Sequence, residues 1–440
     1  METNQYSRRK FARDAARFTL GAALAPQIIP ASVLGRGRTS PSDKIHVGSI
    51  GVGLRGADVM RNFLAQDDVR VVAVCDVNRP VREAARQLVD DHNGDHSCAA
   101  YNDFRELLAR RDIDVVTIAS PDHWHVPMAI AAANAGKDIY LEKPMGLSVS
   151  QDQALRTACH RNGTAFQFGT HQRSFDRFRW ACELVRNGRI GELRTINVWS
   201  PGSTPGGPTA PVPVPPGLDY EMWLGPAPSV PYTEDRCSNK YWWFISDYAL
   251  GFIAGWGIHP LDIALWGGGD KLRCSVEVEG TGVFPSSGLV DTAVDWDIHF
   301  SYTSGVKMHF TGRPLEEWQK YGPLASHGTA FEGAEGWVWI DRENMAASPK
   351  KLESSFIGPG DLHLYRSRDH ARNLLDCVRT RRPTVCPIDD SVQADITCQI
   401  ADIAIRTHQK LRWDPASERF TGNEKANRFL TRPMRSPWQI

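Results

Sequence analysis

Three glycines placed directly after an apolar stretch restrict the fold of this chain more than any other feature. Residues 45–50 have the composition of a buried strand, and Gly51, Gly53 and Gly56 follow them in a G-x-G-x-x-G pattern. Gly51 permits a tight turn, Gly53 leaves the backbone open to a phosphate group, and Gly56 lets the next helix pack close to the strand. Such a strand, turn and helix are typical of a dinucleotide-binding domain, in which Leu54 and Arg55 would lie on the phosphate-binding turn.

A second apolar stretch supports the same interpretation. Residues 69–76 end in Asp76, about 20 residues past the glycines, where a carboxylate can hold a ribose 2′-hydroxyl. An Asp would repel a 2′-phosphate, so the sequence favours NAD over NADP, and Arg79 nearby leaves NADP as an alternative.

Strand and helix patterns alternate through the first part of the chain, which predicts an α/β fold with a doubly wound parallel sheet. Strands are expected at 45–50, 69–76, 115–119, 138–141 and 165–168, and helices at 57–64, 81–91, 103–110, 126–135 and 150–162.

The pattern changes after about residue 169. A helix at 177–187, a Pro/Gly-rich loop at 201–217 and helices at 370–380 and 392–411 accompany strands at 193–199, 274–279, 293–300, 306–311, 329–332 and 337–340. These closely spaced strands predict a second α/β domain with a large, mostly antiparallel open sheet.

The expected organisation is a signal and lead-in at 1–39, a Rossmann domain at 40–168, a substrate and oligomerisation domain at 169–390 and a C-terminal helix and tail at 391–440. The loop at 201–217 is long enough for a lid, an oligomer contact or a substrate-shaping role.

The composition limits the kinds of partner and site that we expect for this chain. Lys plus Arg and Asp plus Glu both number 51, so the balance gives no sign of a nucleic-acid or membrane-surface partner. The nine Cys form no C-x-x-C pair, which indicates mostly buried thiols and no metal site. Several Trp cluster, at Trp223, Trp242, Trp243, Trp256 and Trp266. Indole faces suit sugar rings, although core packing is the commoner role for any single Trp.

The N-terminus has the pattern of an export signal. Residues 7–11, Ser-Arg-Arg-Lys-Phe, match the twin-arginine pattern, and the weakly apolar stretch 18–30 is too short to be a stable membrane span. We therefore expect a periplasmic or other extracytoplasmic location; a basic amphipathic helix in a cytosolic protein is the alternative. Because free NAD is scarce outside the cytoplasm, an exported protein would hold its nucleotide tightly and return it to its starting redox state in each turnover.

Four motifs occur in order along the chain. They are the glycine pattern at 51–56, Ser-Pro-Asp-His-Trp-His at 120–125, Glu-Lys-Pro at 142–144 and Gly-Trp-Gly-Ile-His-Pro-Leu-Asp at 255–262. Their combination resembles the glucose-fructose oxidoreductase / inositol dehydrogenase / rhizopine-catabolism (Gfo/Idh/MocA) family. The resemblance implies a Rossmann domain, a second domain built on an open sheet, NAD(P), a sugar or cyclitol substrate, and a homodimer or homotetramer assembled through that sheet.

The resemblance also assigns roles to residues. Lys143 matches the Lys that contacts substrate and nicotinamide ribose, with Glu142 beside it, and His259 matches the catalytic His. Ser120, Pro121 and Asp122 match a turn beside the nicotinamide, His125 the His that follows it, and Asp262 an acid one helical turn past the catalytic His. One departure stands out: many members carry an Asp where this chain has Gly255, so a proton relay would work without it or use Asp247 or Asp262.

The residues themselves support part of this assignment. A His with a pKa near neutrality can remove a hydroxyl proton as hydride leaves the same carbon, and a Lys can stabilise the developing alkoxide. Residues after the strand at 165–168 are expected in the same cleft, and further candidates flank the Trp cluster. The substrate-binding candidates are His171, Arg173, Trp243, Asp247 and Tyr248; structural roles fit each of them equally well.

Three functions fit these observations. The first is an exported oxidoreductase that acts on a sugar or cyclitol hydroxyl with a tightly bound NAD. The second is a glycoside hydrolase or lyase that oxidises the sugar, eliminates the leaving group and reduces the ketone again, without net redox change. The third, a binding protein without turnover, is disfavoured because both Lys143 and His259 are present.

Overall fold

The structure is a computed structural model that describes residues 43–440 of the chain. The predicted twin-arginine segment at 7–11 and the apolar stretch after it lie outside the described residues. Residues Ile45–Ile440 form one compact unit. Between residues 43 and 440, no helix is long and apolar enough to cross a membrane.

The first half of this unit is a doubly wound parallel sheet, which confirms the predicted fold class. Its strands run in the order β3-β2-β1-β4-β5-β6, and every adjacent pair is parallel. They are β1 (Ile45–Ile50), β2 (Val69–Cys75), β3 (Ala99–Tyr101), β4 (Val115–Ile118), β5 (Asp138–Leu141) and β6 (Phe166–Phe168). The strand order reverses where β1 lies between β2 and β4, so the carboxyl ends of β1 and β4 flank a crevice, the usual place for a ligand in such a sheet.

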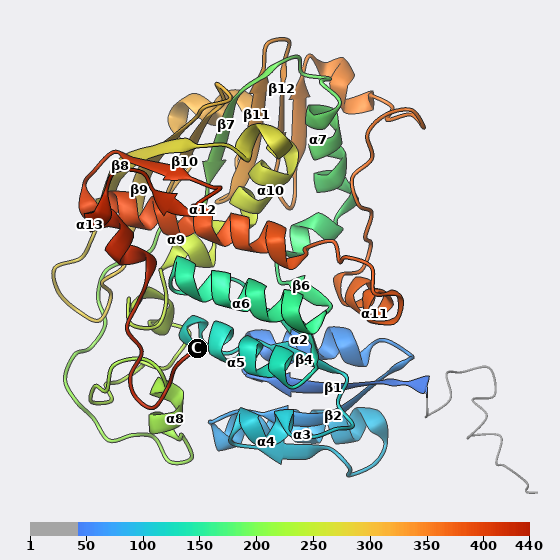
Figure 1. The fold of residues 1–440 in the computed structure, drawn as a ribbon, viewed down its shortest axis with the longest axis vertical. Helices are drawn as coiled ribbons and strands as arrows, with labels where there is room; N and C mark the ends of the chain where they lie inside the picture. The colour runs from blue at the N-terminus through green and yellow to red at the C-terminus, as the bar shows by residue number, and fades with distance from the viewer. Residues whose placement is uncertain (1–42) are drawn as a thin grey trace, which may run out of the picture. The chain divides into compact units, whose positions relative to one another are not determined.

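Helices cover both faces of the parallel sheet (Figure 1). On one face α2 (Leu54–Leu64) and α3 (Arg79–Asn93) share an apolar cluster with β1 and β2, and α11 (His370–Thr380) completes it from late in the sequence. The helices α4 (Phe104–Leu108), α5 (Asp122–Asn134) and α6 (Val149–Asn162) belong to the other large cluster. Burial on both faces explains why the strands are continuous apolar runs.

The second half is built on a sheet of nine strands in the order β13-β12-β11-β7-β10-β9-β8-β14-β15. Only the pair β7–β10 is parallel, so the sheet is mostly antiparallel, as predicted. The strands are β7 (Leu193–Trp199), β8 (Val276–Val283), β9 (Asp295–Tyr302), β10 (Lys307–Thr311), β11 (Gly328–Gly333), β12 (Trp337–Ile340), β13 (Met345–Ser348), β14 (Leu411–Asp414) and β15 (Arg419–Phe420).

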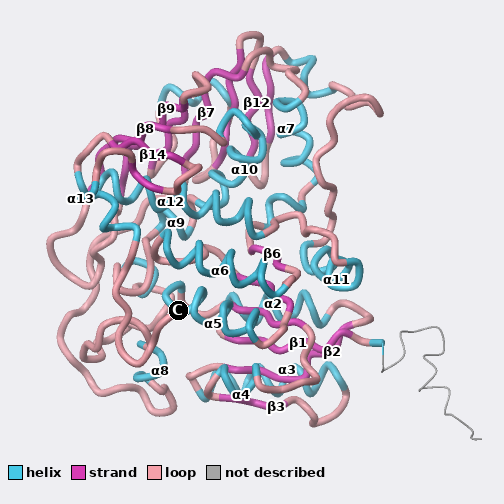
Figure 2. Tube along the Cα trace, viewed as in Figure 1, coloured by secondary structure: helices cyan, strands magenta, loops and turns pink. Residues whose placement is uncertain are grey.

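Three helices cover the inner face of the large sheet: α7 (Asp176–Arg186), α10 (Ile258–Gly268) and α12 (Ile388–Thr407). Figure 2 shows these helices on one side of its strands. Along β9 the side chains of Trp296, Ile298 and Phe300 are buried, whereas His299 and Ser301 are exposed, the alternation expected of a strand with one covered face. Shorter helices, α8 (Tyr220–Leu224), α9 (Phe252–Gly255) and α13 (Glu424–Asn427), lie in the connections.

The differences from the predicted elements lie mostly at ends and in short segments. α12 spans Ile388–Thr407, not 392–411, because His408 adopts a φ of 51° and the chain then enters β14. The prediction missed β3, β13, β14 and β15, none longer than four residues, which are too short to show periodicity.

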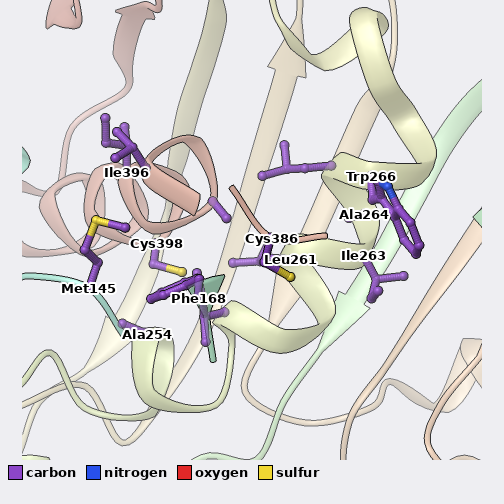
Figure 3. Packing of buried hydrophobic residues seen from close by; sticks show 14 of the residues in the cluster. Met145, Phe168, Ala254, Leu261, Ile263, Ala264, Trp266, Cys386, Ile396 and Cys398 are labelled. Atoms are coloured by element: carbon purple, nitrogen blue, oxygen red, sulfur yellow. The ribbon is translucent and has the colours of Figure 1, made fainter. Parts of the chain in front are cut away.

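One hydrophobic core joins the two halves. Figure 3 shows Phe168 of β6 and Met145, from the segment before α6, packed with Leu261 of α10 and Cys398 of α12. All nine cysteines are free thiols and seven of them are buried, in line with the role predicted for them. Because both sheets contribute residues to this cluster, the hydrophobic core is continuous from the Rossmann half to the half built on the large sheet.

A buried ion pair also joins the two halves. Arg173 lies in the 3-10 turn η2 (His171–Ser174), directly after β6. Its Nη2 donates to Asp262 Oδ1 of α10 at 2.6 Å, and its Nη1 donates to Asp390 Oδ2 of α12 at 2.8 Å. The guanidinium also lies over the ring of Trp266, 5.4 Å from its centroid. The Arg173 and Asp262 side chains are only 3% and 2% exposed.

We expect Arg173→Ala to lower the free energy of unfolding by about 3–5 kcal/mol, because removing one partner leaves a buried charge without compensation. Urea unfolding followed by tryptophan fluorescence measures the effect. Arg189→Ala is the matched control, since Arg189 and Asp361 form a pair at 2.8 Å that is far more exposed, and its loss should cost less than about 1 kcal/mol. Equal effects of the two substitutions would contradict the role assigned to Arg173.

Candidate active site

Most of the predicted site residues line one cavity of about 1100 Å³. Its wall contains the carboxyl end of β1, the end of β2, the turns after β4 and β5, and residues from the second half of the unit. The predicted residues in this wall are Gly51, Gly53, Leu54, Arg55, Gly56, Asp76, Ser120, Pro121, Asp122, His125, Glu142, Lys143, His171, Trp243 and His259.

The glycine turn has the shape that a dinucleotide requires. Gly51 has a φ of 72°, and a Cβ there would lie 2.6 Å from the Ser120 nitrogen. A Cβ on Gly56 would lie 1.8 Å from the Gly51 carbonyl oxygen, whereas a Cβ on Gly53 would meet nothing within 4 Å and would occupy the cavity. Gly53 is the N-cap residue of α2. Because it has no side chain, it leaves the first N–H groups of the helix available to a phosphate.

Asp76 is held in place at the end of β2. Its Oδ2 accepts from Val52 N at 3.0 Å, and its Oδ1 accepts from Asn78 N at 2.9 Å. Burial raises the pKa of this carboxyl, and the two backbone N–H groups oppose the shift. Both oxygens keep lone pairs for hydroxyl donors, so the residue fits the ribose contact predicted for it.

A segment from the second half of the unit closes the cavity beside Asp76. Gly217 O accepts from Arg79 N at 2.8 Å, and Asp219 N donates to Val77 O at 3.0 Å. We call residues 215–239 the strap; among them Pro215, Leu218, Met222, Trp223 and Tyr232 line the cavity. The loop predicted at 201–217 therefore ends on the nucleotide-binding half of the site.

A cluster of charged and polar side chains lies beside Lys143 in the cavity. Glu142 Oε1 accepts from Arg55 Nε at 2.9 Å and from the Tyr140 hydroxyl at 3.1 Å. His171 Nε2 lies 2.6 Å from that hydroxyl and 2.5 Å from Arg55 Nη2. Burial opposes ionisation of Glu142, but His171 and Arg55 outweigh it and hold the pKa of Glu142 well below its usual value.

Lys143 and His259 meet in the same cavity from opposite halves of the unit. Lys143 Nζ donates to Gly255 O at 2.6 Å and lies 5.0 Å from the centroid of the Trp243 ring. Burial, together with the nearby charge of Lys143, lowers the pKa of His259 well below its usual value. Burial also lowers the pKa of Lys143, while Glu142 and Asp122 oppose that shift. At neutral pH His259 is therefore a neutral imidazole beside the Lys143 side chain.

Gly255, which stands where many family members carry an Asp, contacts Lys143 through its backbone carbonyl. The Gly255 carbonyl accepts the hydrogen bond from Lys143, and His259 Nδ1 is buried without a hydrogen-bond partner among residues 43–440. Of the two acids considered as replacements, Asp262 is occupied by Arg173, and Asp247 is outside the cavity wall.

Four predicted residues are not in the cavity wall: Arg173, Asp247, Tyr248 and Asp262. Arg173 and Asp262 satisfy each other in the interior, and Tyr248 is fully buried, with its hydroxyl 3.2 Å from Arg236 Nη1. His125 lines the cavity, but its ring nitrogens lie 2.8 Å from Ser120 O and 2.6 Å from Pro144 O, so the ring fastens the two turns together.

Sequence reasoning missed several cavity residues, among them Asn78, Asn102, Trp124 and Arg342. Asn78, Asn102 and Arg342 each follow a strand closely, and Trp124 lies in the motif at 120–125, so each of the four carries a usable signal. A second omission lies elsewhere: Asp297, His299 and His309, on β9 and β10, offer ligand atoms within 4.8 Å of one another. This group is absent from the cavity wall, and no metal was predicted from the sequence.

The fold and the cavity define a Rossmann-type oxidoreductase that binds NAD. Residues 45–170 match the oxidoreductase family's NAD-binding Rossmann fold, and residues 199–440 match the same family's C-terminal alpha/beta domain. The chain therefore belongs to the Gfo/Idh/MocA family, as its motifs indicated.

Curated relatives share part of the sequence. A glycosyl hydrolase family 109 protein of Saccharopolyspora erythraea is 40% identical over 112 residues, which are 25% of this chain and 24% of that protein. One from Shewanella baltica is 34% identical over 206 residues, 42% of this chain and 44% of that protein. The match thus spans less than half the length of either relative.

Solved structures share the fold at low sequence identity. The aldose-aldose oxidoreductase of Caulobacter crescentus superposes with a TM-score of 0.61 at 19% identity, covering 84% of this chain and 99% of that one. The scyllo-inositol dehydrogenase of Lactobacillus casei gives a TM-score of 0.57 at 17% identity, with coverage of 85% and 99%.

We expect Gly53→Val to abolish NAD binding while leaving the fold intact, because the new side chain fills the space over the turn without a clash and Gly53 has an ordinary φ of −65°. Nucleotide released from the purified, denatured variant, together with its thermal unfolding, measures both properties. Gly360→Val is the control, since a Cβ there also meets nothing within 4 Å. Normal nucleotide content in Gly53→Val would contradict the placement of the cofactor.

Proposed function

We propose that this protein oxidises a hydroxyl group of a sugar or cyclitol by hydride transfer to a bound NAD. The observation that carries the proposal is that His259, whose pKa is held well below its usual value, and Lys143 line the same cavity as the glycine turn. The glycine turn, the N-terminus of α2 and Asp76 would hold the nucleotide, which supplies the hydride acceptor when bound.

The side chains divide the remaining work. His259 accepts the proton of the substrate hydroxyl, because its imidazole is neutral at physiological pH. The Lys143 ammonium donates to the same oxygen and stabilises the negative charge that develops there. Trp243 Nε1 is buried without a hydrogen-bond partner in the described part of the chain, so it is available to a second hydroxyl of the substrate.

The strap supports retention of the cofactor between turnovers. It adds apolar side chains, among them Pro215, Leu218 and Trp223, to the cavity that would hold the nucleotide, and backbone hydrogen bonds fasten it to the turn after β2. A retained cofactor must be returned to its starting state before the next turnover, either by a second substrate or by the product of the first.

Redox-neutral glycoside cleavage is the second candidate, favoured by relatives named glycosyl hydrolase family 109. Oxidation of one hydroxyl to a ketone makes the neighbouring C–H bond acidic. Loss of that proton then expels the aglycone with its bonding electrons, water adds to the resulting double bond, and return of the hydride restores the hydroxyl. The same Lys143 and His259 would serve the oxidation and the reduction.

Location and assembly are proposals that rest on the sequence and on the family resemblance. We propose export by the twin-arginine route, supported by the pattern at residues 7–11. We also propose a homodimer or homotetramer formed through the nine-stranded sheet.

The function is tested with methyl glycosides and protein purified without added cofactor. We expect about one NAD(H) per chain and conversion of a sugar; Lys143→Ala and His259→Ala should lose turnover but keep the nucleotide. Release of methanol without an added acceptor identifies the glycosidase, whereas product formed only with a keto-compound acceptor identifies the oxidoreductase. Full activity of either variant would contradict the proposed site.

The pH dependence of turnover follows from the shifted pKa values. The rate should rise as His259 loses its proton at a pH well below 6.5, stay level through neutrality, and fall as Lys143 loses its proton below pH 10.5. A pH profile of kcat measures both limbs, and His259→Gln should remove the acidic one. An acidic limb centred above pH 6.5 would contradict the neutral imidazole.

A further inference from the structure

Arg342 is presented to the cavity by a rigid turn after β12. The buried side chain of Asp341 accepts from the backbone N–H groups of Glu343 at 2.7 Å and Asn344 at 2.5 Å. The Arg342 carbonyl in turn accepts from Arg177 Nη2 at 3.0 Å. These bonds fix the backbone, and the Arg342 side chain forms part of the cavity wall.

The guanidinium of Arg342 has no acidic partner. Between residues 43 and 440, no carboxylate lies within 4.0 Å of it, whereas Arg55 pairs with Glu142 and Arg173 pairs with Asp262. Arg342 instead lies 4.9 Å from the centroid of the Trp256 ring. That ring makes an edge contact with His259, at 5.6 Å between centroids, which places Arg342 beside the reacting end of the cavity.

Positive charge exceeds negative charge at this end. Arg55, Lys143 and Arg342 line the wall with the carboxyl groups of Glu142 and Asp122. Glu142 is ionised and paired with Arg55, while burial raises the pKa of Asp122 well above its usual value and favours its neutral form. Among the described residues, neither Lys143 nor Arg342 forms an ion pair with a carboxylate, and the charge of each lowers the pKa of His259.

The phosphates of the nucleotide are not the anion that Arg342 would bind. Phosphates held by the glycine turn would contact the N-terminus of α2, which is an element of the Rossmann half. Arg342 comes from the large sheet, on the side that supplies His259 and Trp256. Its planar guanidinium is suited to paired hydrogen bonds with an oxyanion, a geometry that a neutral hydroxyl does not match.

We propose that Arg342 forms an anion subsite and that the natural substrate is an acidic sugar, bearing a carboxylate or a sulfate ester. The inference rests on the proposed function, and it adds the substrate class. The Arg342 guanidinium, which lies over the Trp256 ring, binds the oxyanion, and the sugar ring then lies between this contact and the Lys143–His259 pair.

The test uses sugars that differ only in the group at carbon 6, which is neutral or anionic. Methyl glycosides of glucose, galactose and mannose, in both anomers, are compared as the neutral sugar, the 6-carboxylate and the 6-sulfate. Because a charge-assisted contact is worth more than a neutral one, we expect kcat/KM for one acidic form to exceed that for its neutral partner by about 10-fold to 100-fold. The preferred acidic form distinguishes carboxylate from sulfate, and comparable or better turnover of neutral sugars overturns the proposal.

Arg342→Gln should abolish the preference, so that kcat/KM for the acidic form falls to about that for its neutral partner in the same variant. Arg194→Gln, at an exposed residue of β7 outside the cavity wall, should keep the preference. Nucleotide content and thermal unfolding are measured on both variants. Loss of nucleotide from a folded Arg342→Gln protein would assign the residue to the cofactor and overturn the subsite.

A binding measurement separates this inference from the proposed function. If no glycoside in the set is turned over, the proposed function fails, and tryptophan fluorescence titrations with free glucuronate, glucose 6-sulfate and glucose still examine the subsite. Tighter binding of an acidic sugar that Arg342→Gln abolishes would support the subsite by itself. Equal affinity for acidic and neutral sugars would overturn it.

Discussion

The buried contact of Arg173 with Asp262 holds the two halves of the active site together. Arg173 follows β6 of the parallel sheet, and Asp262 lies in α10, three residues after His259. The same turn begins with His171, which contacts Tyr140 and Arg55 beside Lys143. A shift of α10 against β6 would therefore move His259 away from Lys143 and break a charge pair inside the protein. The shared apolar core resists the same motion, so catalytic geometry and stability depend on one contact region.

Charges in and around the cavity fall into two groups. Arg173 and Arg55 are paired with carboxylates and fix the framework, whereas Lys143 and Arg342 have no carboxylate partner in the part of the chain that the structure describes. Lys143 and Arg342 repel each other, and the charge of each lowers the pKa of His259. Arg342 is an exposed residue, and an oxyanion on the substrate would give its guanidinium a charged partner. Burial and these two charges make His259 a base at neutral pH without help from a carboxylate.

The same arrangement serves either proposed reaction, because both begin with removal of a hydroxyl proton and a hydride from one carbon. Known structures of this fold, at TM-scores near 0.6, include an aldose-aldose oxidoreductase and an inositol dehydrogenase, while the curated sequence relatives are named glycosyl hydrolases. What separates the outcomes is the fate of the ketone and of the cofactor. The strap over the nucleotide half is fastened by backbone hydrogen bonds to the turn after β2, which supports the proposal of a cofactor that stays bound and of a reaction that closes its own redox cycle.

The sequence by itself determined the parallel sheet, the glycine turn, Asp76, and the pairing of Lys143 with His259, because each depends on a local pattern or on a family motif. It could not determine short strands such as β3 or β15, which have too few residues to show a period. Nor could it separate lining from supporting residues: Arg173 and Asp262 are 89 residues apart, and only folding shows that they bind each other and not the substrate. Arg342 is the converse case, an ordinary surface residue in sequence that the turn after β12 brings beside His259. A side chain's role depends on partners distant in sequence, and only the tertiary structure decides which partners it meets.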